Sequence, residues 1–159
     1  MAIQIRKAEI EDISSIQYIA KKSWNDTYKE LIPVPIQEKF LKEAYSDEFM
    51  IKRVQQSLLM VAEDKVKLVG FANAFIKGNK GELSAIYLLP EVQRQGIGSQ
   101  LLEAMITKLN DINEIYVEVE KGNLIGERFY EAKGFKLVRE YEDDFYGHTL
   151  QTKRLILNV

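Results

Sequence analysis

Alternating and periodic apolar residues predict both strands and helices from the beginning of the chain. Ile3 and Ile5 alternate with polar neighbours, as the residues of a half-buried strand do. Ile13, Ile16 and Trp24 follow at roughly helical spacing, which predicts an amphipathic helix. The chain therefore opens with a strand followed by a helix.

Two helical segments and a β-hairpin are predicted next. The helical segments lie within residues 25–56 and are separated by the proline-containing segment 33–35. Residues 58–63 and 65–76 are apolar and strand-forming, and Glu63-Asp64 is the expected turn between them. A second turn, rich in glycine and lysine, leads into the next strand.

A strand, a turn, a glycine loop and a helix follow one another within residues 82–105. Residues 85–89 form an apolar run of strand length that ends at Pro90, which has no backbone donor. Gly96 and Gly98 lack Cβ atoms, so an anion can approach the backbone closely. Apolar residues then recur at helical spacing, and the first turn of that helix would present free N–H groups and its positive dipole end to the loop. This arrangement predicts a phosphate-binding site.

The last part of the chain again alternates strands and helices. Residues 114–119 alternate between apolar and polar side chains, as a strand does. Asn123 would cap a short helix, and Gly134 would close it at the C′ position. Two more strands, residues 135–141 and 149–157, are expected to end the chain, with a loop between them.

Length and composition are those of one globular domain. The chain has 159 residues, of which 46% are hydrophobic and 29% charged, so it is long and apolar enough to bury a core. We therefore expect a single α/β (α+β) domain over residues 1–159 with a mixed, mostly antiparallel sheet. Only the strand–helix–strand unit should run parallel.

Charge and residue types exclude several functional classes. A net charge of −2 argues against a general nucleic-acid-binding protein. The chain has no cysteine and one histidine, His148, so disulfides, thiolate sites and multi-histidine metal sites are excluded, and no metal is predicted. The N-terminus becomes charged before any long apolar segment, and no run approaches the ~20 residues of a membrane helix. We expect a cytoplasmic protein that binds neither nucleic acid nor membranes.

The glycine loop alone leaves several kinds of site open. A dinucleotide-binding fingerprint needs a third glycine where Leu101 stands, and a P-loop needs a lysine followed by serine or threonine. Both patterns are therefore disfavoured. A tight strand-to-helix turn without any ligand remains an alternative on this segment alone.

Two segments together resemble the GNAT superfamily of N-acetyltransferases. Residues 93–98 read Q-x-x-G-x-G after I-Y-L-x-P at residues 86–90, which is similar to the R/Q-x-x-G-x-G/A signature of that family. Residues 123–135 resemble its N-x-x-A-x-x-F-Y-x-x-x-G-F segment, with Gly126 where alanine is usual. A helical glycine costs up to ~1 kcal/mol relative to alanine, and we interpret it as tolerated packing. The match is residue by residue from about Glu82 to Phe135.

The resemblance implies acetyl-CoA as the acyl donor and a sheet whose fourth and fifth strands splay apart. Backbone N–H groups of residues 95–99 would hold the pyrophosphate, and Arg94 would be a further phosphate partner. The backbone of residues 86–88 would pair with the pantetheine arm as an added strand pairs with a sheet edge. The residues implied to bind the cofactor are Ile86, Tyr87, Leu88, Gln93, Arg94, Gln95, Gly96, Ile97, Gly98, Ser99, Asn123 and Tyr130.

The resemblance also implies three catalytic groups. Acetyl transfer to an amine needs a deprotonated amine, a stabilised oxyanion and a proton for the leaving thiolate. Glu82 would be the general base, directly or through water, and Tyr130 would donate a proton to the thiolate. The backbone N–H of Leu88 would stabilise the oxyanion. A solvated glutamate and a packing tyrosine are the simpler alternatives for the first two.

Acceptor-side residues are less well defined by the sequence. Trp24 and Tyr28 lie where the family covers the acceptor, although packing of a helix onto the sheet would also explain them. Four acidic side chains would make the cleft acidic and favour a cationic amine; Glu118 and Glu120 lie near the end of the strand at residues 114–119, and Asp143 and Asp144 lie in the last hairpin. The substrate-binding candidates are Trp24, Tyr28, Glu118, Tyr146 and His148.

The sequence thus predicts an acetyl-CoA-dependent N-acetyltransferase. The acetyl group would move directly to a primary amine of a small molecule or a peptide N-terminus, with a polyamine-like cation among the candidates. The lack of cysteine agrees with direct attack, because no thiol is present to carry an acetyl group. The alternative is a non-catalytic protein of the same fold that senses acyl-CoA or binds a partner. Members of the family often dimerise, which leaves a homodimer open.

Overall fold

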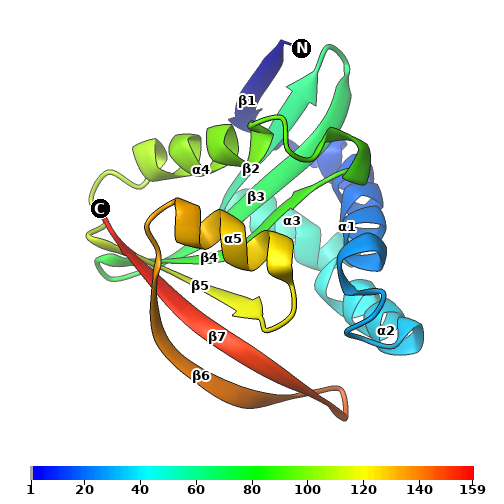
Figure 1. Ribbon diagram of the computed structural model, residues 1–159. Coiled ribbons are helices and arrows are strands. Elements are labelled where there is room, and N and C mark those ends of the chain that lie inside the picture. The colour runs from blue at the N-terminus through cyan, green and yellow to red at the C-terminus, as the bar shows by residue number, and fades with distance from the viewer. Residues whose placement is uncertain (1) are drawn as a thin grey trace.

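The computed structural model describes residues 2–159 and contains a seven-stranded sheet (Figure 1). Met1, the first residue of the predicted domain, lies outside the described residues. The strands are β1 (Ile3–Lys7), β2 (Leu58–Asp64), β3 (Lys67–Lys77), β4 (Lys80–Leu88), β5 (Glu114–Glu120), β6 (Lys136–Phe145) and β7 (His148–Asn158). The helices are α1 (Ile13–Tyr28), α2 (Val34–Ala44), α3 (Asp47–Gln56), α4 (Ile97–Lys108) and α5 (Leu124–Ala132), with short 3₁₀ turns η1 (Ile10–Asp12) and η2 (Pro90–Val92).

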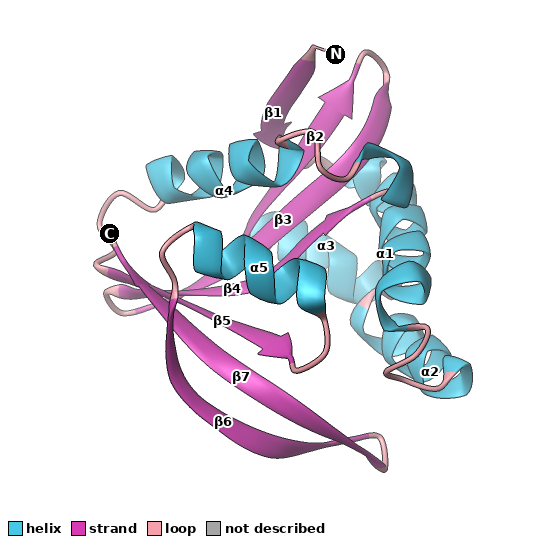
Figure 2. Cartoon of the chain, in the orientation of Figure 1, coloured by secondary structure: helices cyan, strands magenta, loops and turns pink. Residues whose placement is uncertain are grey.

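The sheet is mixed and mostly antiparallel, as the sequence predicts. Its strands follow the order β1-β2-β3-β4-β5-β7-β6 (Figure 2). Every neighbouring pair is antiparallel except β4 and β5, which run parallel because α4 carries the chain back across the sheet between them. The one parallel pair therefore occurs at the predicted strand–helix–strand unit.

Helices cover both faces of this sheet. Helices α4 and α5 lie on one face, and α1, α2 and α3 pack against one another on the other (Figure 1). Ile16 of α1, Phe71 of β3 and Leu101 of α4 are fully buried, so core packing continues on both sides of the strands. Over residues 2–159, no helix is both long and apolar enough to cross a membrane.

Strands β4 and β5 stay paired over only part of their length. Their ladder joins Lys80–Leu83 to Glu114–Val117 and then stops, although both strands continue. Ser84 sits at an irregularity in the β3–β4 ladder, where the register shifts between Asn73 and Ala74. A bulge bends its strand and increases the local twist, so it helps to direct β4 away from β5. The splayed strands implied by the family resemblance are confirmed.

Three element boundaries differ from the predicted ones. The first hairpin turns at Lys65 and Val66 rather than at Glu63-Asp64. The prolines near residue 34 start α2 instead of only breaking the helix, because proline fits the first helical turn. The last hairpin has a short turn at Tyr146 and Gly147, both with positive φ, so residues 142–145 belong to β6 rather than to a loop.

Candidate active site

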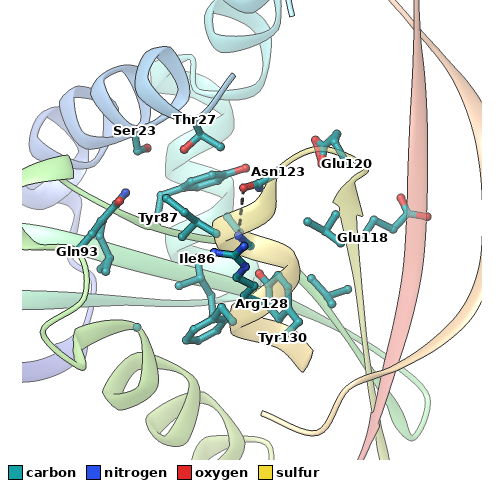
Figure 3. A pocket seen from close by; sticks show the side chains of 18 of the residues that line it. Ser23, Thr27, Ile86, Tyr87, Gln93, Glu118, Glu120, Asn123, Arg128 and Tyr130 are labelled. Atoms are coloured by element: carbon teal, nitrogen blue, oxygen red, sulfur yellow. Dashed lines mark hydrogen bonds between the residues drawn. The ribbon is translucent and has the colours of Figure 1, made fainter. Parts of the chain in front are cut away.

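A cleft of about 610 Å³ opens where β4 and β5 separate. Its walls come from β4, β5, α1, α5 and the loop before α4 (Figure 3). These elements are distant in sequence, and the interrupted β4–β5 ladder is what allows side chains from both faces of the sheet to reach one cavity. The cleft contains most of the predicted cofactor-binding residues.

The backbone of β4 offers hydrogen-bond donors to this cleft. The N–H of Leu89 donates to the carbonyl oxygen of Val69 on the β3 side, at 2.9 Å. Because successive N–H groups of a strand point to opposite edges, those of Ile86 and Leu88 point away from β3. No strand pairs with β4 on that side beyond Leu83 within the described ladder. An extended amide-containing ligand would fit this free edge.

The loop between β4 and α4 has the backbone conformation of an anion site. Arg94 and Gly96 both have positive φ, at 67° and 81°, so the chain turns sharply just before the helix. Gly96 is the N-cap of α4 and contributes no side chain, which leaves the first-turn N–H groups without a side-chain acceptor. These groups and the positive end of the helix dipole face the predicted phosphate position.

Gly98 keeps this loop close to α5. A Cβ atom built on Gly98 would lie 3.2 Å from Cε1 of Phe129 and 3.9 Å from a methyl group of Leu88. Helix α5 itself starts at Asn123, whose Oδ1 accepts a hydrogen bond from the Gly126 N–H at 3.1 Å. It ends at Gly134 with the backbone bonds Phe135 N–H to Tyr130 O and Gly134 N–H to Glu131 O. Both predicted caps are present.

Gly126 has a packing reason that the sequence did not reveal. A Cβ atom at this position would lie 2.7 Å from Nδ2 of Asn123 and 3.1 Å from a methyl group of Val119. The glycine therefore lets α5 sit directly against β5 while the Asn123 cap stays in place. The small residue belongs to the wall of the cleft and is more than a tolerated substitution.

Tyr130 lies at the buried centre of the cleft. Its side chain is 8% exposed and packs edge-on against Phe129 and Phe135, at ring-centroid distances of 5.2 and 5.3 Å. Burial, followed by the charge of Glu120, raises the pKa of the Tyr130 hydroxyl well above its usual value. The hydroxyl therefore stays protonated and can donate a hydrogen bond to a ligand atom in the cleft.

Three side chains form a polar cluster at the α1 end of the cleft. The hydroxyl oxygens of Tyr28 and Tyr87 are 3.3 Å apart, and burial raises the pKa of both tyrosines. Glu120, the last residue of β5, also lines the cleft. Burial raises the pKa of its carboxyl group to about 7, although hydrogen bonding with Tyr28 acts in the opposite direction. Within this cluster the two tyrosines therefore stay protonated near neutral pH, and Glu120 is the group that can exchange a proton there.

Glu118 has a different environment on the same strand. It lines the cleft, but its carboxylate accepts a hydrogen bond from the Tyr141 hydroxyl and lies 3.6 Å from the Arg154 guanidinium. Figure 3 shows its side chain directed toward β7 rather than toward Tyr87. Glu118 therefore adds negative charge to the cleft wall while one of its oxygens, Oε2, already has both Tyr141 and Arg154 as partners.

Glu82 does not line this cleft. It lies in a separate cavity of about 250 Å³ with Lys80, Tyr116 and Arg154 among its neighbours. Its two carboxylate oxygens accept hydrogen bonds from Arg154 at 2.8 and 3.1 Å. Glu82 lies in the part of β4 that is still paired with β5, before the two strands separate. Its side chain is therefore outside the opening between the strands. In this structure Glu82 therefore forms an ion pair with Arg154, and its role as general base stays a prediction.

Three predicted substrate-binding residues also lie outside the cleft. Trp24 is 4% exposed and stacks on Phe40 with a ring-centroid distance of 4.4 Å, which agrees with the alternative that it packs the helix onto the sheet. Tyr146 donates a hydrogen bond to Glu43 at 2.6 Å, and Nε2 of His148 donates to the carbonyl oxygen of Leu31 at 3.0 Å. These contacts fasten the β6–β7 turn to α2 and to the segment before it.

The remaining predicted residues divide between side-chain and backbone roles. The cleft is lined by Tyr28, Ile86, Tyr87, Leu88, Gln93, Arg94, Gly96, Gly98, Ser99, Glu118, Asn123 and Tyr130. Ile97 is buried in the core, at 1% exposure, so only its backbone groups are available to a ligand, and Gln95 is exposed but outside the lining of the cleft.

Several lining residues were not predicted as site residues. Ser23 and Thr27 are one helical turn apart on α1, and Arg128 lies on α5. The spacing of Ser23 and Thr27 on an otherwise apolar face was a usable signal. Glu120 was noted only for its charge, because nothing in the sequence shows that it is partly buried beside two tyrosines.

Charge is distributed unevenly along the cleft. Arg94 belongs to the glycine loop at one end, and Glu118 and Glu120 lie at the end of β5, while Arg128 of α5 adds a second positive charge to the lining. An anionic ligand portion is therefore favoured at one end and a cationic one at the other. The buried Tyr130 hydroxyl lies in the wall between them (Figure 3). The cleft can therefore bind an anionic carrier and a cationic acceptor so that they meet beside the buried Tyr130.

Comparison with known protein families gives a match over most of the chain. A family model described as "Acetyltransferase (GNAT) family" matches residues 18–135. These residues include most of α1, the splayed strands, the glycine loop and α5.

Individual relatives and solved structures agree with this match. The chain is 35% identical over 153 residues to a spermidine N(1)-acetyltransferase of Thermoplasma acidophilum, covering 91% of this chain and 95% of the relative. It is 32% identical over 143 residues to an N-alpha-acetyltransferase of Saccharolobus solfataricus, covering 85% and 81%. The crystal structure of PaiA N-acetyltransferase from Thermoplasma acidophilum in complex with coenzyme A superposes with a TM-score of 0.88 at 29% identity, covering 100% of both chains.

Proposed function

The chain belongs to the GNAT acetyltransferase family and is an N-acetyltransferase, and from this premise we propose that it acetylates a primary amine of a polyamine-like cation with acetyl-CoA as donor. The observation that carries the proposal is the cleft between the splayed strands, which has Arg94 in the glycine loop at one end and the carboxylates of Glu118 and Glu120 on β5. The relative of 35% identity is named for activity on spermidine, which is a cation of this class.

The donor end of the cleft fits a coenzyme A molecule. Free N–H groups at the start of α4, together with Arg94 and Arg128, suit a pyrophosphate group. The unpaired edge of β4 suits the amides of the pantetheine arm. The solved neighbour that superposes over its full length holds coenzyme A, which supports the same donor here.

The acceptor end fits a cationic amine. Glu118 and Glu120 line the cleft beyond Tyr130, and Asp143 lies close enough to raise the pKa of Glu120 through its charge. Clustered carboxylates with low-dielectric walls concentrate cations, so a molecule with several ammonium groups gains more than a single amine. Peptide N-termini stay the second candidate acceptors, because one relative is named an N-alpha-acetyltransferase.

Two groups of this chain would assist the transfer at the centre. The N–H of Leu88 points to the free edge of β4, where it would donate a hydrogen bond to the thioester oxygen as negative charge develops there. The Tyr130 hydroxyl keeps its proton, because burial raises its pKa, and would donate it toward the leaving sulfur. A cytoplasmic location and an acceptor amine as the main partner stay predictions from the sequence.

The proposal is tested by release of coenzyme A thiol from acetyl-CoA in the presence of an amine panel. The panel contains spermidine, an aminoglycoside, a free amino acid and a peptide with a free N-terminus, and mass spectrometry identifies the acetylated product. We expect the highest kcat/KM for spermidine. Higher kcat/KM for the peptide would favour N-terminal acetylation. Binding of acetyl-CoA without turnover on any amine would favour a sensor protein and refute the proposal.

A further inference from the structure

The cleft requires a proton acceptor that the structure does not provide at Glu82. An amine of the proposed substrate class has a pKa near ~10 and reaches the enzyme mainly as an ammonium ion, which cannot attack a thioester. Glu82 is bound by Arg154 on the closed part of the sheet and lines a different cavity. Another group must therefore accept the proton if the reaction is to be fast near neutral pH.

Glu120 differs from the other carboxylates around the cleft in its partners. Glu118 is engaged by Tyr141 and Arg154, and Glu127 forms an ion pair with Lys153 at 2.5 Å. Across the described part of the chain, Glu120 has no arginine or lysine nitrogen within ion-pair distance. Its carboxylate is therefore free to take a proton from a bound cation without first breaking a salt bridge.

Titratable groups from several neighbouring elements face Glu120. On its own strand Glu118 is the neighbouring charge, and on β7 its register partner is the uncharged Thr152. The titratable groups that interact with Glu120 from the other packed elements are Tyr28 of α1, Tyr87 of β4, Tyr130 of α5 and Asp143 of β6. Three hydroxyls and two carboxylates thus surround one partly buried acid.

The position of Glu120 also suits the direction of the reaction. It is the last residue of β5 and lies near α1, while Gln93, from the loop before α4, lies on the opposite side of the cleft (Figure 3). A cation entering from the acidic end meets Glu120 and the Tyr28–Tyr87 hydroxyl pair before it reaches Tyr130. The hydroxyl pair can orient the nitrogen by hydrogen bonds while the carboxylate removes its proton.

We propose that Glu120 is the catalytic base of the transfer, taking one proton from the ammonium of the acceptor; this assignment rests on the proposed function. The freed nitrogen lone pair forms the bond to the carbonyl carbon, and the carbon–sulfur bond breaks with its electron pair on sulfur. Nitrogen loses a second proton as the amide forms. Tyr130 donates its proton to sulfur and is reprotonated by that second proton. Overall one proton is released, and Glu120 passes it to solvent.

The protonation behaviour of Glu120 supports this role. Burial raises its pKa to about 7, so the ionised form needed for a base is populated at and above neutral pH. A base with a pKa near the working pH combines an available acceptor form with useful basicity. An exposed glutamate would be ionised at lower pH but would be a weaker proton acceptor.

The test compares Glu120→Gln with wild type by the dependence of kcat/KM for spermidine on pH. For wild type we expect kcat/KM to rise through an acid limb with an apparent pKa of about 7 and then to level off. For Glu120→Gln we expect the limb to disappear, a loss on the order of 10²-fold near neutral pH, and a rate that keeps rising toward pH ~10 as free amine accumulates. Glu114→Gln, on the same strand but paired with Lys80 away from the cleft, is the matched control.

Two measurements on the same variant show whether it is folded. Because burial raises the pKa of Glu120 from 4.5 to about 7, ionising this carboxylate costs stability progressively as the pH rises between these two values, and the whole cost is present above about 7. Glu120→Gln should therefore unfold at a higher temperature than wild type at about pH 8 and at a similar one at about pH 4. Its affinity for acetyl-CoA should be unchanged.

The outcomes separate this assignment from the proposed function. If wild type acetylates no amine, the proposed function fails and the assignment fails with it. If wild type turns over and Glu120→Gln keeps the acid limb near pH 7, the assignment alone is overturned. A raised KM for spermidine with kcat and the limb unchanged would make Glu120 a counter-ion only, and it would equally overturn the assignment.

Discussion

Replacing Glu82 with glutamine should weaken the fold slightly and leave the acid limb of the pH–rate profile in place. In the protein, Glu82 accepts two hydrogen bonds from Arg154, and both side chains are 24% exposed. Hydrogen bonds to charged groups contribute ~1.5–3 kcal/mol when buried, and exposed ion pairs contribute ~0.2–1 kcal/mol. Because Glu82 and Arg154 are only partly exposed, we expect the contribution of their ion pair to stability to lie between these limits.

The size of the effect follows from what remains after the substitution. Glutamine keeps one carbonyl oxygen that can accept from Arg154, and Arg154 keeps Glu118 at 3.6 Å and the Tyr116 ring at 4.5 Å. We therefore expect a loss of about 1 kcal/mol in the free energy of unfolding. For a chain of this length that corresponds to a decrease of roughly 2–4 °C in Tm.

Thermal unfolding and kcat/KM for the best amine, both measured across pH, check this prediction. If Glu82 were the base, kcat/KM near neutral pH would fall by ~10²–10⁴-fold and the profile would shift to alkaline pH. Glu114→Gln, whose ion pair with Lys80 is longer at 3.9 Å, should change stability by no more than ~0.5 kcal/mol. A lost acid limb in Glu82→Gln with unchanged Tm would refute the reasoning and restore Glu82 as the base.

Three further substitutions test the donor side. Tyr130→Phe should lower kcat by roughly 10²-fold with little change in acetyl-CoA affinity, because the phenyl ring keeps the packing and only the donated proton is lost; equal kcat would remove the proton-donor role. Gly98→Val should destabilise the protein by ~1–3 kcal/mol and raise the KM for acetyl-CoA, since a Cβ atom already approaches Phe129 to 3.2 Å. Thermal unfolding and initial rates check the Gly98→Val prediction, and unchanged values would show that α5 adjusts freely. Arg94→Ala should weaken acetyl-CoA binding about tenfold in calorimetry, with a smaller difference at high salt. Alanine adds no new strain there, because both residues must adopt the same positive φ, and salt-independent binding would contradict a phosphate contact.

Much of the fold could be predicted because its signals are local. The glycine loop, the Asn123 cap and the Gly134 stop each depend on residues a few positions apart. The parallel pairing of β4 and β5 also follows from a strand–helix–strand order. The resemblance to a family added the splay of these strands, which no periodicity in the sequence indicates. The single-domain organisation over residues 1–159 stays a prediction.

The catalytic roles were harder to predict because they depend on contacts between distant segments. Glu82 and Arg154 are far apart in sequence, so nothing near Glu82 shows that its carboxylate is taken. Glu118 and Glu120 look alike as alternate residues of one strand. Only the folded chain places one beside Arg154 and the other beside Tyr28. Burial and partner choice, and not residue type, separate a structural carboxylate from a reactive one.

The last hairpin shows the same limit. Tyr146 and His148 were predicted to bind substrate; in the structure they lie outside the lining of the cleft and form hydrogen bonds to Glu43 and to the carbonyl oxygen of Leu31. The bond from His148 depends on the position of the segment that contains Leu31, which is far away in the sequence. No local sequence pattern predicts such a contact. Trp24 was likewise open between packing and binding, and its stacking on Phe40 places it in the core.

The most direct test of the account is a crystal structure with coenzyme A and N-acetylspermidine bound together. We predict that the coenzyme sulfur lies between β4 and β5 within hydrogen-bond distance, ~2.7–3.5 Å, of the Tyr130 hydroxyl. The acetylated nitrogen should lie on the α1 side, next to Glu120 and the Tyr28–Tyr87 pair. A sulfur placed outside the splayed strands, or an amine beside Glu82 and Arg154, would contradict the account.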